Sequence, residues 1–154
     1  MADNTLSLSI TLQAPLNVAW SSILDWPSQS SWMLLTRVWV TKESSTLVGT
    51  QIAAFTGIAP ALWKREKFLG ILDLMEVTRI EKSEAKALCE VSHYGKVIKG
   101  SGTFKLHSLD STRTRFDWSE TIRAPRALFL LIKPFIALGV YISLARFSKG
   151  LRTL

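Results

Sequence analysis

The first dozen residues alternate between apolar and polar side chains. Leucine and isoleucine occupy the even positions from 6 to 12, and serine or threonine the odd positions between them. A period of two predicts a strand with one buried face. Pro15 ends this strand and suits the first turn of a helix. The apolar positions that follow predict two short helices, 17–24 and 28–32, separated by turn residues that begin at Asp25.

Six further segments have the apolar and β-branched content of strands. They are residues 38–41, 49–55, 68–81, 84–94, 97–109 and 112–122. Gly95-Lys96 and Asp110-Ser111 mark tight turns between consecutive strands, and residues 56–67 form a longer connection. Strands joined in sequence by short turns predict an antiparallel sheet, one face of which needs a cover.

The end of the chain, residues 124–154, is strongly apolar, with Lys133 and Pro134 within the run. Such a run is typical of a membrane span or of a helix buried inside a protein. Its apolar side chains favour a bilayer by roughly 4–7 kcal/mol, whereas a deep lysine costs about 2.5–3.5 kcal/mol. Insertion is therefore marginal, while the preceding sheet offers a partner. The pattern predicts a helix over 124–152, about 40 Å long, lying across the sheet of a protein that dissolves without detergent.

Five stretches carry a resemblance to a known group of proteins. They are SITLQAPLNVAWSSILDWPSQSSW at 9–32, LDLMEV at 72–77, VIKGSGTFKL at 97–106, FDWSETIRAP at 116–125 and ARFSKGLR at 145–152. Together they resemble the SRPBCC superfamily of polyketide cyclases, START proteins and birch-pollen allergens, and its small bacterial members in particular. The resemblance implies one α+β domain over 1–154 with a helix-grip fold. In that fold a curved antiparallel sheet of about seven strands wraps around a long C-terminal helix, and two short helices follow the first strand. It also implies a cavity between sheet and helix for apolar ligands.

Composition agrees with one globular domain. The chain has 154 residues, 47% of them hydrophobic, which allows one sizeable core. Its single cysteine excludes an intrachain disulfide. The first ten residues lack the basic and apolar regions of a signal peptide, so we expect a cytoplasmic protein.

The net charge of +7 is unevenly distributed along the chain. Residues 1–77 hold 5 Lys/Arg and 6 Asp/Glu, whereas residues 78–154 hold 14 and 6. This balance predicts weak, salt-sensitive contact with anionic membranes. Nucleic-acid binding is not expected, because the basic residues are spaced along strands rather than grouped with stacking aromatic residues.

Two hairpins indicate which side chains face the expected cavity. A two-residue turn at Gly95-Lys96 pairs His93 with Ile98, Val91 with Gly100 and Cys89 with Gly102. The apolar residues of the second strand must face the core, and the period of two carries its glycines and their partners to the same side. We therefore expect His93 and Cys89 to face inward.

The last strand adds a carboxylate to this face. Phe116, Trp118 and Ile122 face inward and carry Glu120 with them, and a three-residue turn puts Glu120 opposite Gly102. Convergent polar groups on an apolar face are typical of a small-molecule site. The expected ligand-binding residues are Glu120, Trp118, Phe116, His93, Gly100, Gly102, Phe104, Phe129 and Lys133, with the glycines leaving space and Lys133 pointing back toward Glu120. The register of 68–81 stays open, since either Glu76 or Asp73 and Met75 face inward.

The sequence gives less support to metal binding and to nucleophilic catalysis. Cys89 and His93 lie about 13 Å apart along a strand, and His107 is at the far end of the hairpin, so no metal site and no cofactor are expected. A buried Cys89 without an adjacent base is typical of a core residue rather than a nucleophile, and no catalytic residue is assigned. The sparse polar groups favour a carrier or sensor of a hydrophobic small molecule or lipid. A cyclase- or aromatase-like enzyme with Glu120 and His93 as acid and base is the alternative, and lipid exchange at anionic membranes is a second one; ligand and oligomeric state stay open.

Overall fold

The computed structural model describes residues 2–58 and 69–152. Its elements are β1 (Ala2–Leu12), α1 (Leu16–Leu24), α2 (Gln29–Trp32), β2 (Thr36–Lys42), β3 (Gln51–Ile58), β4 (Leu69–Lys82), β5 (Lys86–Tyr94), β6 (Lys99–Ser108), β7 (Thr114–Ala124) and α3 (Arg126–Leu151). This order confirms the predicted strand, two short helices, six strands and long helix. Most of the predicted connection at 56–67, and the predicted strand start at Phe68, lie outside the described residues.

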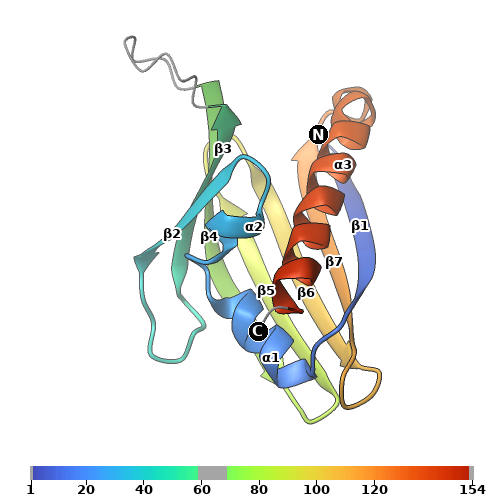
Figure 1. Ribbon diagram of the computed structural model, residues 1–154. Coiled ribbons are helices and arrows are strands. Elements are labelled where there is room, and N and C mark those ends of the chain that lie inside the picture. Colours follow the sequence, from blue (N-terminus) through green and yellow to red (C-terminus); the bar gives the residue numbers. More distant parts are fainter. Residues whose placement is uncertain (1, 59–68, 153–154) are drawn as a thin grey trace.

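The strands form one antiparallel sheet. Its order is β1-β7-β6-β5-β4-β3-β2, so the first strand returns to pair with the last. The sheet curves around α3, which crosses its concave side. On the same side α1 lies at the lower end and α2 lies near mid-height, in contact with β2 and α3 (Figure 1). This arrangement is the predicted helix-grip fold.

A bulge in β4 decides the register that the sequence left open. The pairing of β4 with β5 shifts between Val77 and Arg79. Before the bulge Asp73, Met75 and Val77 share the inner face, and after it Ile80 opposite Cys89 does. Asp73 and Met75 therefore face inward. Glu76 faces the other side, where its carboxylate accepts a hydrogen bond from Gln51 at 3.0 Å.

Much of the core lies between the sheet and α1, α2 and the C-terminal half of α3. Leu106 and Phe116 of the sheet are fully buried there, and Trp20 and Trp26 from α1 and the turn after it are 6% and 5% exposed. Aromatic rings join the layers, since Trp26 packs on Phe104 with ring centroids 6.2 Å apart. Dense packing at this end fixes the position of the strands that carry the polar groups described below.

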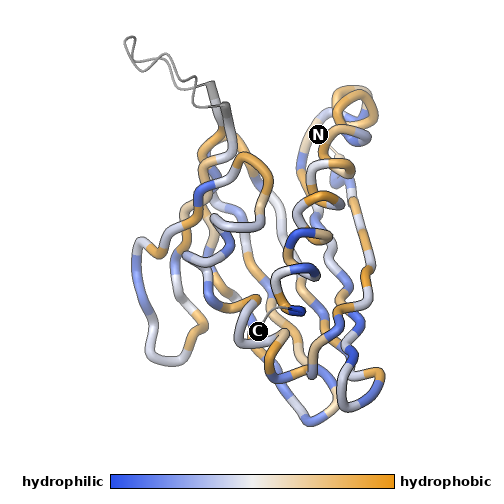
Figure 2. Tube along the Cα trace, viewed as in Figure 1, coloured by the Kyte–Doolittle hydropathy of each residue, from blue (hydrophilic) through white to orange (hydrophobic). Residues whose placement is uncertain are grey.

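The helix α3 lies where the sequence predicts it, but the sheet covers only one of its sides. Its buried residues are Phe129, Ser143, Leu144, Phe147 and Leu151, four of them in the C-terminal half. The Ser143 hydroxyl donates to the Gly139 carbonyl at 2.7 Å and accepts from the Leu34 amide at 2.9 Å, which anchors this half beside α2. The helix is long and apolar enough to cross a membrane, and only 17% of its most apolar window is buried. The sheet therefore does not account for the whole apolar run, since Leu131, Phe135 and Leu138 are exposed. Figure 2 shows the hydrophobic stretches along the helix.

Candidate functional site

A buried histidine on β5 forms a bond with a carboxylate on β4. The imidazole Nδ1 of His93 lies 2.8 and 3.0 Å from the two carboxylate oxygens of Asp73. The side chains are 4% and 13% exposed. Because a carboxylate accepts, Nδ1 carries the proton and donates it, which fixes the ring orientation and leaves Nε2 for other chemistry.

The second ring nitrogen faces a carboxylate two strands away. Nε2 of His93 is buried and has no hydrogen-bond partner among the described residues. It lies 3.6 Å from Oε1 of Glu120 on β7, a distance too long for a hydrogen bond. The strand between them is β6, where Gly102 pairs with Glu120 as predicted. A Cβ at Gly102 would lie 3.4 Å from Nε2, so the absent side chain lets the imidazole reach across the strand.

The electrostatic environment of this cluster favours the protonated forms of His93 and Glu120. Burial disfavours the charged imidazole, but the hydrogen bond to Asp73 and the charges of Asp73 and Glu120 together raise the pKa of His93 above its ordinary value. Burial raises the pKa of Glu120, Asp73 adds to the increase, and His93 opposes it. Both groups therefore hold their protons more tightly than exposed ones do. Because Nε2 lies 3.6 Å from Oε1 of Glu120, the two groups titrate as a coupled pair.

The cluster of Asp73, His93 and Glu120 lies among apolar side chains and yet reaches solvent. Trp118, which precedes Glu120 on the inner face of β7, is 9% exposed, and Phe104 packs partly buried beside the core. The Asp73 and Glu120 side chains keep 13% and 19% exposure. The polar atoms of the cluster would orient the polar end of a ligand that reached them among these apolar side chains.

The cluster fits a metal ion less well than it fits hydrogen bonds. One ligand atom from each of the three residues lies within 4.8 Å of the others. However, Nδ1 of His93 is engaged by Asp73, so only Nε2 and Glu120 are left for a cation. Catalytic zinc sites use three protein ligands. The prediction of no metal site considered cysteine and histidine and left out Asp73, and so it missed the cluster itself.

The glycines have roles other than the predicted one of leaving space. Gly100 has φ +147°, and a Cβ there would overlap the carbonyl oxygen of Thr121, so the backbone requires glycine. At Gly102 a Cβ would lie 2.9 Å from Val91 and close to His93. The space over Gly102 is therefore taken by Val91 and the imidazole, and a Gly102→Leu substitution would displace these side chains rather than fill a void.

The predicted pairing of β5 with β6 is wrong by two residues. His93 pairs with Gly100, Val91 with Gly102 and Cys89 with Phe104, because four residues rather than two connect the strands. A shift of two keeps every side chain on its predicted face. His93 and Cys89 therefore face inward as expected.

The remaining candidates lie apart from the cluster. Phe116 is fully buried and Phe129 is 4% exposed, both within the core. Lys133 is exposed on α3, and the charges that act on Glu120 are those of His93 and Asp73. Burial, with a smaller contribution from Glu90, raises the pKa of the Cys89 thiol to about 12, so this residue stays a neutral thiol and not a nucleophile.

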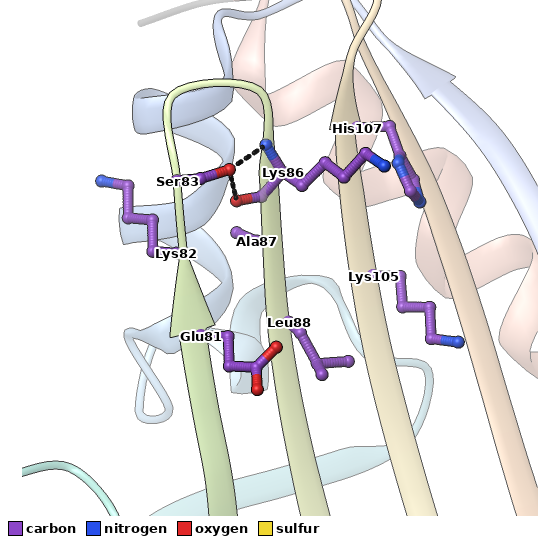
Figure 3. A pocket seen from close by; sticks show the side chains of 8 residues that line it. All are labelled: Glu81, Lys82, Ser83, Lys86, Ala87, Leu88, Lys105 and His107. Carbon is purple, nitrogen blue, oxygen red and sulfur yellow. Dashed lines mark hydrogen bonds between the residues drawn. The ribbon is translucent and has the colours of Figure 1, made fainter.

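A groove lies on the opposite face of the sheet. It has a volume of about 430 Å³ and is lined by Glu81, Lys82, Ser83, Lys86, Ala87, Leu88, Lys105 and His107. Figure 3 shows it near the turn from β4 to β5, with the helices behind the strands and the Ser83 hydroxyl bonded to Lys86. Six of its eight lining residues are polar or charged, and none of them belongs to the cluster of Asp73, His93 and Glu120.

Comparison with known proteins supports the fold. No family profile and no curated protein sequence matches the chain. Zhui aromatase/cyclase from Streptomyces sp. R1128 has a TM-score of 0.69 at 11% identity, over 98% of this chain and 94% of that one. A START superfamily protein from Mycobacterium smegmatis has 0.64 at 12%, over 97% and 94%. Norcoclaurine synthase from Thalictrum flavum, in complex with dopamine and hydroxybenzaldehyde, has 0.66 at 10%, over 99% and 88%. The fold expected from the resemblance to SRPBCC proteins is thus confirmed. The proteins that share it include a START superfamily protein and two enzymes.

Proposed function

We propose that the protein binds a hydrophobic small molecule between the sheet and α3, with its polar end at Asp73, His93 and Glu120. The observation that supports this most is the unpaired Nε2 of His93, buried 3.6 Å from a carboxylate. A buried polar atom without a partner is costly, and a ligand that supplies one gains that free energy. A hydroxyl fits, because it accepts from a protonated Nε2 and donates to an ionised Glu120.

The test compares two ligands that differ by one hydroxyl. Displacement of an uncharged apolar dye such as Nile red is measured for 2-naphthol and naphthalene. The outer side of α3 is exposed and apolar, so it could bind the dye as well. All measurements are therefore made on the Leu131→Gln/Phe135→Gln variant, which removes this second binding surface. In this variant, the further substitution Glu120→Gln should lower the affinity for 2-naphthol by about 5- to 150-fold, the equivalent of about 1–3 kcal/mol. Naphthalene should bind as before.

A matched control separates the cluster from the rest of the sheet. Glu90 lies on β5, and its side chain is 35% exposed and pairs with Arg79. Glu90→Gln should leave the affinities for both compounds unchanged. If Glu120→Gln changes neither affinity, or both alike, the carboxylate does not recognise the polar end and the proposal is wrong.

An acid–base enzyme is the second candidate, supported by the bond between Asp73 and His93. Held at Nδ1, a neutral imidazole offers Nε2 as a base, and its orientation does not depend on the ligand. A proton then moves from a carbon next to a carbonyl to Nε2, while protonated Glu120 gives its proton to the carbonyl oxygen, which yields an enol. The raised pKa of Glu120 keeps that proton available at higher pH.

Exchange of carbon-bound hydrogen tests this reaction without a known substrate. With 1-tetralone in deuterated buffer, NMR follows the loss of the protons next to the carbonyl. The wild type should accelerate the loss, increasingly as the pH rises through the raised pKa of His93. His93→Gln should abolish the acceleration, whereas His107→Gln on the outer face should keep it. Equal rates for wild type and His93→Gln would leave the binder as the better account.

A further inference from the structure

The outer face of α3 combines large apolar side chains with high exposure. Its members are Leu128 (50% exposed), Leu130 (58%), Leu131 (70%), Phe135 (74%), Leu138 (58%) and Tyr141 (58%). At about 100° per residue, Leu131, Phe135 and Leu138 project within about 60° of one another. The buried Phe129 and Phe147 lie on the opposite side of the helix. A helix that is apolar all round is stable in water only when something covers both sides, and the sheet covers one.

The charges on α3 indicate what covers the other side. The helix contains Arg126, Lys133, Arg146 and Lys149, Arg152 follows it, and there is no acidic residue. Arg146 and Lys149 extend the outer face at its C-terminal end, since Lys149 lies in line with Leu131 and about 21 Å along the axis from Phe135. Within the described chain none of these basic side chains forms an ion pair.

A second copy of the chain fits this surface poorly. Leu128, Leu131, Phe135 and Leu138 follow the 3–4 spacing of a helix-pairing stripe. Paired helices, however, use opposite charges beside the stripe, and α3 offers positive charges alone. Two copies would bring like charges together, whereas an anionic bilayer supplies both an apolar interior and negative headgroups.

We infer that the outer face of α3 docks the protein on anionic lipid bilayers. The apolar side chains enter the boundary between headgroups and acyl chains, and Arg146 and Lys149 contact the negative headgroups. The contacts of α3 with β1 and α2 stay in place, because the buried residues are on the other side of the helix. Docking does not depend on what the cluster of Asp73, His93 and Glu120 binds.

The test is co-sedimentation of the full chain with vesicles of phosphatidylcholine, with and without phosphatidylserine. At low salt the wild type should partition at least tenfold more strongly into the anionic vesicles. Raising the salt from about 0.01 M to about 1 M shortens the screening length from about 30 Å to about 3 Å and should remove most of this preference. Arg146→Gln/Lys149→Gln should lower binding about fivefold for each charge, on anionic vesicles only.

The apolar contribution has a matched control. Leu131→Gln/Phe135→Gln should lower binding more than tenfold, and circular dichroism should stay unchanged because both residues are exposed. Leu109→Gln, at a leucine 50% exposed on the turn after β6, should bind as the wild type does. Lys105→Gln, on the face of the sheet away from α3, is the charge control.

Three results would overturn the inference. The first is a wild type that does not sediment with anionic vesicles at low salt. The second is a Leu131→Gln/Phe135→Gln variant that binds as Leu109→Gln does. The third is a dimer in sedimentation velocity that Leu131→Gln/Phe135→Gln dissociates, without vesicle binding, since a second copy would then cover the outer face. The dye displacement by 2-naphthol is measured without lipid, so the two proposals fail independently.

Discussion

Replacing Asp73 with asparagine removes the charge that holds His93 while keeping the shape of its partner. The bond joins Nδ1 to a carboxylate at 2.8 Å, between side chains that are 4% and 13% exposed. A hydrogen bond to a charged group contributes about 1.5–3 kcal/mol to stability and a neutral one about 0.5–1.5 kcal/mol. The amide oxygen of the introduced asparagine would still accept a hydrogen bond from Nδ1. The expected loss of stability is therefore close to the difference between a charged and a neutral hydrogen bond.

The loss depends on pH with a definite sign. The pKa of His93 is raised in the folded protein, so its contribution is complete below the unfolded value near pH 6.5 and declines as the pH rises through the folded pKa. Asp73→Asn should therefore lower the free energy of unfolding by about 1–2 kcal/mol near pH 5, and by clearly less near pH 9. Urea titrations at both pH values measure this difference.

NMR supplies a control within the same molecule. The chain has two histidines, and His107 lies on the outer face, 3.9 Å from Asp117. Asp73→Asn should lower the pKa of His93 and leave the ring signals of His107 at a given pH unchanged. A His93 that titrates at or below the ordinary histidine pKa in the wild type, or an equal loss of stability at both pH values, would refute the reasoning.

Three further predictions concern single positions. Glu120→Gln should flatten the decline of stability with rising pH above about pH 4.5, because the raised pKa of Glu120 costs stability once it ionises; urea titration across pH shows whether the decline persists. Cys89, with no exposed surface and a thiol pKa of about 12, should react with iodoacetamide only on unfolding, and fast labelling of the native protein would contradict its burial. Gly100→Ala should destabilise by several kcal/mol, since its Cβ meets Thr121, whereas Gly139→Ala on α3, which has open space, should stabilise by about 0.5–1 kcal/mol; equal thermal midpoints would be inconsistent with this pair.

Much of the fold follows from local patterns in the sequence. The alternation of the first strand and the apolar and β-branched content of the other six locate the strands. The three-residue turn predicted after β6 puts Glu120 opposite Gly102, and it closes with a bond from the Leu109 amide to the Arg113 carbonyl. The turn after β5 is longer than Gly95-Lys96 indicates, which moves the pairing by two residues. Since two is the period of a strand, the inward position of His93 survives the error.

Asp73 could not be assigned from the sequence for a physical reason. The bulge after Val77 changes which positions face inward, so Val77 and Ile80 favour opposite registers when the strand is taken as regular. Only the pairing of β4 with β5 settles this. The exposure of α3 was missed for a different reason, because an apolar pattern shows that a residue avoids water and not which surface covers it.

The ring nitrogens of His93 test the central claim most directly. Nitrogen-15 NMR of labelled histidine can follow Nδ1 and Nε2 separately while a ligand that displaces the dye, such as 2-naphthol, is added. The account predicts a large change at Nε2 of His93, a small one at Nδ1, which keeps its bond to Asp73, and none at His107. A ligand that binds between the sheet and α3 and leaves the signal of His93 Nε2 unchanged would contradict the account.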